Sequence, residues 1–147
     1  MINLSGRWKG QYKYGKGYAP QDRGRVEPFE FYIVDSSGSI GGSCYDAIVE
    51  KITGNESYII GYHNGKTIHF KKRYKIHVNT DGEAMDGTVQ PYTTDGIDYS
   101  GKIRRGLFSK RLKVVGTWKI TYRYKDEFNQ PQEGYSSGTW RMVKLEG

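Results

Sequence analysis

The sequence predicts an all-β protein, a single antiparallel up-and-down barrel of about eight strands spanning residues 1–147 as one domain. The composition favours strands and turns, since 13 of the 147 residues are tyrosine and 20 are glycine. Segments of alternating apolar and polar residues recur along the chain, and no helical periodicity of useful length interrupts them. A short pattern, G-x-W-[K/R], occurs at Gly6–Lys9, Gly116–Lys119 and Gly138–Arg141 and contains all three tryptophans. Its copies lie near both chain ends, where the closing of a barrel brings the first and last strands together.

The first expected strand shows the alternation clearly, because Leu4, Trp8 and Tyr12 fall on one face and Arg7 and Lys9 on the other. The same reasoning places eight strands at 4–14, 29–34, 39–45, 57–63, 67–78, 97–103, 111–124 and 134–145. Residues 35–38 have the composition of a tight turn. Asn64-Gly65 predicts a type I′ hairpin turn, with positive φ at both central residues.

The expected connections differ in length in an ordered way. Those after the first, third, fifth and seventh strands are long: 15–28, 46–56, 79–96 and 125–133. The connections between the other consecutive strands are short. Residues 46–56 fit either a continued strand or a short turn of helix. In a meander the connections alternate between the two ends of the barrel, so the four long ones predict a loop-lined mouth and the short ones a narrow base.

The tryptophans are expected to plug this base. We expect Trp118 to face Trp140 across the last two strands, which places Tyr122 opposite Ser136 and Tyr124 opposite Gly134. The glycine two residues before each tryptophan would leave room for a neighbouring indole.

The opening Leu4–Trp8 resembles the L-[ST]-G-x-W start of the calycin barrels, the avidin-like and lipocalin-like proteins. This resemblance implies an antiparallel barrel of about eight strands that holds one small ligand. Gly10 stands where avidin-like proteins carry the first of their biotin-binding polar residues, so biotin recognition is not carried over. The start is also similar to haem-binding nitrobindin-like barrels. Haem is not expected, because Tyr12 and Tyr14 replace that family's next glycines and no histidine follows His77.

The mouth half of the interior is expected to bind a small ligand. Its predicted lining is Tyr12, Tyr14, Phe29, Phe31, Lys72, Tyr74, Tyr122, Tyr124 and Ser136. Tyrosines offer a flat apolar face and a hydroxyl, so such a lining suits a planar or partly polar organic molecule. The alternative is that the rings meet and fill the interior.

Lys72 interrupts an apolar face between Phe70 and Tyr74. A buried ammonium needs an anion or a route to water. Lys72 could therefore bind a carboxylate or phosphate of a ligand or pair with an interior acid. A bulge could instead turn it outward.

Catalysis has no constellation of residues to support it, and no cofactor or metal is expected. His63, His69 and His77 lack a metal-ligand spacing, and Cys44 on its glycine-rich strand fits packing. A barrel enzyme is a third reading, with Lys72, a tyrosine hydroxyl or Asp46 as the acid–base group.

The net charge of +7 with a pI near 9.4 supports a second reading, a binder of nucleic acid or another polyanion. Outward basic residues recur in two clusters, Lys71, Arg73 and Lys75, and Lys102, Arg104, Arg105, Lys110, Arg111 and Lys113. A membrane partner is not expected, because no apolar run approaches about 18 residues. Without a secretory signal we expect a cytoplasmic protein, and oligomerisation stays open.

Overall fold

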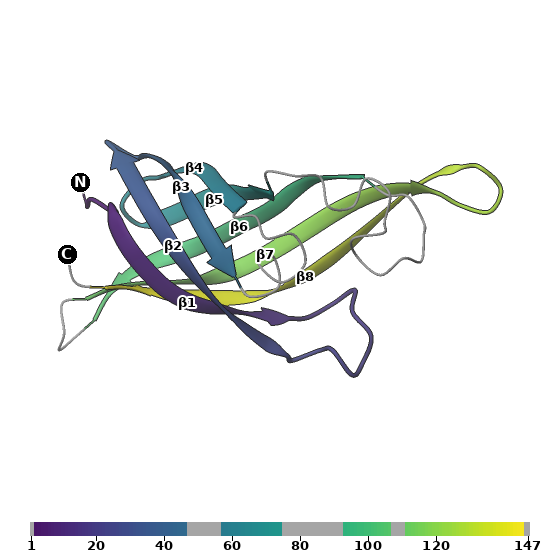
Figure 1. The fold of residues 1–147 in the computed structure, drawn as a ribbon, viewed down its shortest axis with the longest axis horizontal. Coiled ribbons are helices and arrows are strands. Elements are labelled where there is room, and N and C mark those ends of the chain that lie inside the picture. Colours follow the sequence, from purple (N-terminus) through teal and green to yellow (C-terminus); the bar gives the residue numbers. More distant parts are fainter. Residues whose placement is uncertain (1, 47–56, 75–92, 107–110, 146–147) are drawn as a thin grey trace.

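The computed structural model describes residues 2–46, 57–74, 93–106 and 111–145, and these form one closed barrel (Figure 1). Its strands are β1 (Gly6–Tyr14), β2 (Val26–Ser36), β3 (Ser39–Asp46), β4 (Ser57–His63), β5 (Thr67–Tyr74), β6 (Thr93–Arg105), β7 (Leu112–Lys125) and β8 (Pro131–Lys144). Each strand pairs antiparallel with the next, and β8 pairs with β1. The predicted all-β, up-and-down barrel is confirmed.

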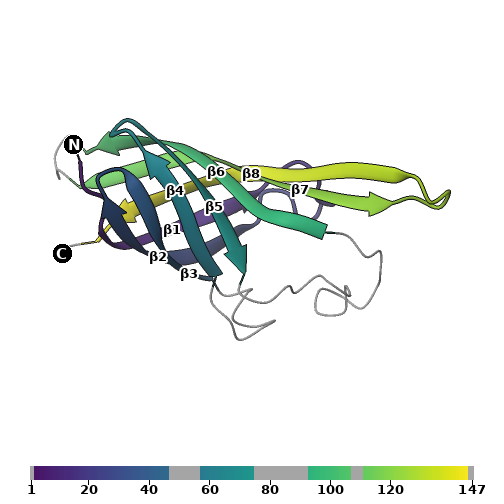
Figure 2. The same ribbon diagram turned by 90° about the horizontal axis from the view of Figure 1, so that it is seen from above.

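Strand boundaries agree well with the prediction, and 57–63 agrees at both ends. Strand β2 begins three residues earlier than expected, because its ladder with β1 continues through Pro28, which lies opposite Gln11. Strands β7 and β8 continue as a two-stranded ribbon past the rest of the barrel (Figure 2), so their connection shrinks to 126–130. Of the connections expected at 46–56 and 79–96, residues 47–56 and 79–92 lie outside the described residues. Asp46 belongs to β3, and residues 93–96 belong to β6, which begins four residues earlier than expected.

The two hairpin turns described at the base differ in backbone conformation. Ser37 and Gly38 have φ values of 53° and 102°, the signs of a type I′ turn. The type I′ prediction for Asn64-Gly65 is wrong, because only Gly65 has a positive φ, 88°. The Asn64 side-chain oxygen instead accepts hydrogen bonds from the amides of Lys66 (2.9 Å) and Thr67 (2.8 Å). Hydrogen bonds from the Asn64 side chain thus stabilise this turn, and its backbone does not adopt the expected type I′ conformation.

The predicted tryptophan pairing is also wrong, by two residues. Trp118 lies opposite Gly138, and Trp140 lies opposite Gly116. Tyr122 therefore faces Gly134, and Ser136 faces Ile120. A Cβ atom on Gly138 would lie 2.5 Å from the Trp118 ring, so this ring occupies the space that the glycine leaves free. Two indoles directly opposite one another would compete for that space.

All three tryptophans are buried, at most 3% exposed, and they lie at different levels of the interior. Trp8 pairs with Lys144 and donates its indole N–H to the Leu4 carbonyl (2.9 Å), near the start of β1. Trp118 contacts Tyr14 and Tyr18 near the β1–β2 connection. The indoles are therefore distributed along the barrel and do not form one layer.

A buried polar network ties the chain start to the β2–β3 and β4–β5 turns. Asp35 Oδ2 accepts the Leu4 amide (2.7 Å) and lies 2.6 Å from His63 Nε2, while Asp35 Oδ1 accepts the Gly38 amide (2.9 Å). The Gly65 amide donates to His63 Nδ1 (3.0 Å). Since Nδ1 accepts a hydrogen, His63 carries its proton on Nε2 and donates it to Asp35. The carboxylate thereby joins three segments of the base, the chain start, the β2–β3 turn and the end of β4.

Burial opposes ionisation of Asp35 and by itself would raise its pKa. The hydrogen bonds from Leu4, Gly38 and His63 outweigh burial, and the pKa of Asp35 is held below its ordinary value. A carboxylate with a lowered pKa in the folded state stabilises the fold above its ordinary pKa, and this contribution is lost as the pH falls.

Asp35→Ala should lower the free energy of unfolding by about 3–5 kcal/mol, because it leaves buried donors of the network without an acceptor. Chemical denaturation measures the change. Glu127→Ala, on the exposed β7–β8 connection, is the control and should stay within about 0.5 kcal/mol of the wild type. A loss below about 1 kcal/mol for Asp35→Ala would show that the network contributes little.

Asp35→Asn should reveal the pH dependence. The gap in unfolding free energy between wild type and variant should be constant above pH ~5 and narrow below pH ~4, where the wild-type carboxylate takes up a proton. Denaturation curves across this range measure the gap, with Glu127→Gln as control. A gap independent of pH would contradict an ionised Asp35.

Gly138→Ala should destabilise the barrel by about 1–3 kcal/mol, since its Cβ would meet the Lys13 carbonyl oxygen and the Trp118 ring. Gly41→Ala is the matched control on β3, because only the Ile59 carbonyl lies near its Cβ, at 3.8 Å. Thermal unfolding of both variants gives the comparison, and equal melting temperatures would disprove the indole–glycine fit.

Candidate functional site

Aromatic side chains make up a connected part of the barrel interior. They point inward because every second residue of a strand faces the same side. The Phe29 and Phe31 ring centroids lie 4.5 Å apart, and Phe70 stacks on Tyr99 at 4.8 Å with an interplanar angle of 9°. Tyr12 stacks on Phe29 at 6.2 Å. These contacts form a continuous aromatic lining from β1 and β2 across to β5 and β6.

Lys72 enters this lining as a charged group that is only 2% exposed. Its Nζ atom lies 5.3 Å from the Tyr12 ring centroid and 5.5 Å from that of Tyr99, within the range of cation–π contacts. Its neighbours across the sheet are Ile59 and Ile97. The side chain therefore faces inward, and the alternative that a bulge turns it outward is excluded.

The connection 15–25 folds over the β8 side of the interior. The Gly15 amide donates to the Ser137 carbonyl and the Ser137 amide to the Lys16 carbonyl, both at 2.8 Å. Gly17, with a φ of 93°, passes so close to buried Ser136 that a Cβ on it would lie 2.5 Å from the hydroxyl. Tyr18 from this connection packs against Tyr14 at 4.6 Å. This part of the predicted mouth is thus partly covered by aromatic rings.

The structure brings most of the predicted lining together. Tyr12, Phe29, Phe31, Lys72 and Ser136 are buried. Tyr14 is half-buried and contacts Tyr12, its rings edge to face at 5.6 Å.

Three predicted lining residues lie elsewhere or are not described. Tyr122 and Tyr124 are half-buried on the β7–β8 ribbon, opposite Gly134 and Gln132 and beyond the end of the β1–β8 ladder. The Tyr74 backbone pairs with Ser57, and its side chain is outside the described residues.

Tyr99 and Tyr18 are site residues that the sequence reasoning missed. Tyr99 had a usable signal, because it is two residues from Ile97 and therefore on the same face of its strand. The sequence did not show which residue of β5 it lies beside, because the Asn64-Gly65 turn fixes the register of β5 against β4 but not that of β6 against β5. Tyr18 had no signal, since a residue in a long connection has no periodicity to place it. Both flank groups that the sequence did single out, Lys72 and Trp118.

The described residues show no group of three or more histidine, cysteine, aspartate or glutamate side chains that could hold a metal ion. Cys44 is buried, and the Ser57 hydroxyl donates to its carbonyl at 3.2 Å. The side chain of Asp46 lies outside the described residues. Among the described residues, no helix has the length and apolarity needed to cross a membrane.

Comparison with solved structures finds likenesses to other proteins, one of which is rhizavidin. The chain is similar to rhizavidin, with 14% identity over 95% of this chain and 84% of that one, and a TM-score of 0.46. At this identity and TM-score no conclusion about family, ligand or function is drawn from the match. No protein-family model matches the sequence, and neither does any curated protein.

Proposed function

We propose that this protein binds a small, planar organic anion in the barrel interior, with the anionic group directed at Lys72. The observation that carries the proposal is the position of the Lys72 ammonium, 2% exposed and flanked by the rings of Tyr12 and Tyr99. An ammonium held beside aromatic rings can form a charge-assisted hydrogen bond with the carboxylate or phosphate of a ligand.

The aromatic rings around Lys72 indicate the chemistry of the uncharged part of the proposed ligand. Phe29 and Phe70 stack on Tyr12 and Tyr99, the two tyrosines beside Lys72, and Phe31 contacts both phenylalanines. The tyrosines add hydroxyls that can hydrogen bond to polar substituents. A flat molecule with one carboxylate or phosphate fits this chemistry, whereas a purely aliphatic or a cationic molecule does not. This is the common pattern of small-molecule sites, mostly apolar with a few polar groups that fix orientation.

Native mass spectrometry of the protein as purified tests the proposal directly. A mass excess that denaturation removes is expected, and the released molecule should be an aromatic or conjugated acid. If the protein carries nothing, titration with aromatic carboxylates and phosphates should quench tryptophan fluorescence, because Trp118 contacts Tyr12. A clean mass together with no quenching by any compound would reject the proposal.

Lys72→Met should abolish most of this binding, because it keeps the length of the side chain and removes the charge. Lys71→Met is the matched control, since its side chain points outward, toward Asp98 at 3.7 Å. Affinity for the bound acid should fall at least tenfold in Lys72→Met, a cost of about 1.4 kcal/mol or more, and stay near the wild-type value in Lys71→Met. Equal affinities in the two variants would remove Lys72 from the site, and matching circular dichroism spectra would show that both fold.

A further inference from the structure

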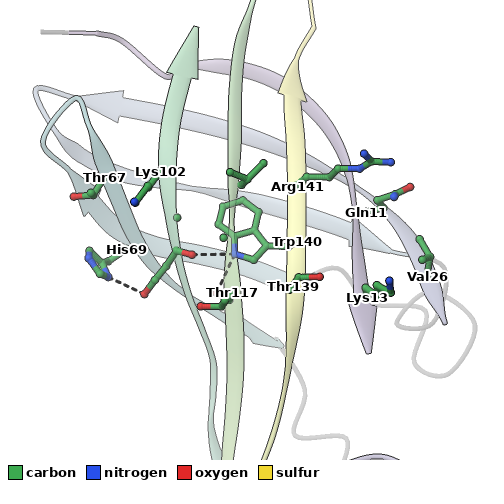
Figure 3. A pocket seen from close by; sticks show the side chains of 14 residues that line it. Gln11, Lys13, Val26, Thr67, His69, Lys102, Thr117, Thr139, Trp140 and Arg141 are labelled. Carbon is green, nitrogen blue, oxygen red and sulfur yellow. Dashed lines mark hydrogen bonds between the residues drawn. The ribbon is translucent and has the colours of Figure 1, made fainter. Parts of the chain in front are cut away.

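A trough of about 880 Å³ crosses the outer face of the barrel over β5, β6, β7, β8 and β1 (Figure 3). It follows two neighbouring rows of outward side chains that run across the strands. In the first row Lys102 pairs with Val115, Val115 with Arg141 and Arg141 with Gln11. With its amide oxygen turned toward Arg141, Gln11 accepts hydrogen bonds of 2.8 and 3.1 Å from the guanidinium.

The second row supplies a floor of small hydroxyl side chains. It runs from His69 through Ser100, Thr117 and Thr139 to Lys13. The Ser100 hydroxyl lies 3.0 Å from His69 Nδ1. In Figure 3, Lys102 and His69 lie on one side of the trough and Arg141, Gln11 and Lys13 on the other, with Thr117 and Thr139 between them.

Glycines on the inner face explain why the outer face is hollow here. Gly101 and Gly116 lie opposite each other, and a Cβ on Gly101 would lie 2.9 Å from the Trp140 ring. Without these side chains the backbone of β6 and β7 lies directly on Trp140, whose indole N–H donates to the carbonyls of Thr117 (3.0 Å) and Ser100 (3.2 Å). The short floor therefore rests on a buried indole, while the longer basic side chains stand at its sides.

Positive charge dominates the trough and its borders. The two central rows contain Lys13, Lys102 and Arg141 and no acidic residue. The next row toward the base contains Lys9, Lys113 and Arg104. Val143 pairs with both Lys9 and Lys113, and Lys113 pairs with Arg104. The next row toward the long connections contains Lys71, Asp98 and Lys119, so one acid stands among two lysines.

Exposed aromatic rings adjoin this basic surface. Tyr62, 61% exposed, continues the second row beyond His69, and the two ring centroids lie 5.5 Å apart. Tyr135, 51% exposed, lies under the Lys119 ammonium, 4.8 Å from Nζ to the ring centroid. Proteins that bind single strands combine a basic groove along the phosphates with aromatic rings on which bases stack.

We propose that the trough binds single-stranded nucleic acid, with the phosphates along Lys102, Arg141 and Lys13 and bases on Tyr62 and Tyr135. From β5 to β1 it spans four strand spacings, about 19 Å. This is enough for a short stretch of an extended strand. The aromatic rings favour a nucleic acid over a sulfated polysaccharide, which has no base to stack. The site is separate from the barrel interior, so it can act whether or not a small ligand is bound there.

The test is fluorescence anisotropy of a labelled oligothymidine of about 12 nucleotides, within the size range of single-strand sites. Binding is expected at roughly 50 mM salt, weakening as salt rises. The triple variant K13S/K102S/R141S should lose at least about tenfold in affinity, and its plot of log K against log salt should be shallower by about 2, three contacts at ~0.7 each. The control K16S/R23S/K125S removes the same charge from exposed positions outside the trough and should bind nearly as the wild type.

Two further measurements separate nucleic acid from other polyanions. An abasic strand of equal length should bind more weakly than oligothymidine, and Tyr62→Ser should remove much of that difference. No binding at low salt, or equal losses in both triple variants, would overturn the trough as the site. Equal affinity for the abasic strand would overturn nucleic acid as its ligand.

Discussion

The ladder between β1 and β8 closes the sheet, and most other features depend on that closure. It places Tyr12 opposite Trp140 and Tyr14 opposite Gly138, which brings the first strand onto the indoles of the last two. Glycine stands where two of the indoles cross a neighbouring strand, Gly138 beneath Trp118 and Gly101 beneath Trp140. Closure also removes both free edges of the sheet, so the strands need no other cover.

Asp35 and Lys72 are both buried, and they differ in the groups that surround them. Asp35 is held by two amides and His63 within the fold, which accounts for its role as a structural centre of the base. Lys72 is enclosed by the rings of Tyr12 and Tyr99, which attract a cation but provide no negative charge of their own. Asp35 lies among the turns of the base and Lys72 among the aromatic rings of the interior, so the ligand site is proposed around Lys72.

The inner and outer surfaces are linked through the same few residues. Gly101 and Gly116 let the sheet lie on Trp140, and this packing leaves the small hydroxyl side chains outside as the floor of a trough. The basic residues beside that floor follow from alternation along the strands. Lys102 points outward because Gly101 faces inward on β6, and Arg141 points outward because Trp140 faces inward on β8. The register of the strands then aligns the two in one row. Packing inside thereby shapes a surface outside.

The sequence by itself determined the strand number and the antiparallel closed barrel, because alternation of period two and turn residues are local signals. It placed Lys72 on an apolar face, but only the structure excluded a bulge that would turn this side chain outward. It could not determine the register of β7 against β8, since a shift of two residues keeps every side chain on its face, and only the indole–glycine fit selects between them. Nor could it join Asp35 to His63 or place Tyr99 beside Lys72, because those contacts arise between strands far apart in the chain. The trough is likewise a property of the tertiary structure, since its two rows contain residues from five strands that only barrel closure aligns.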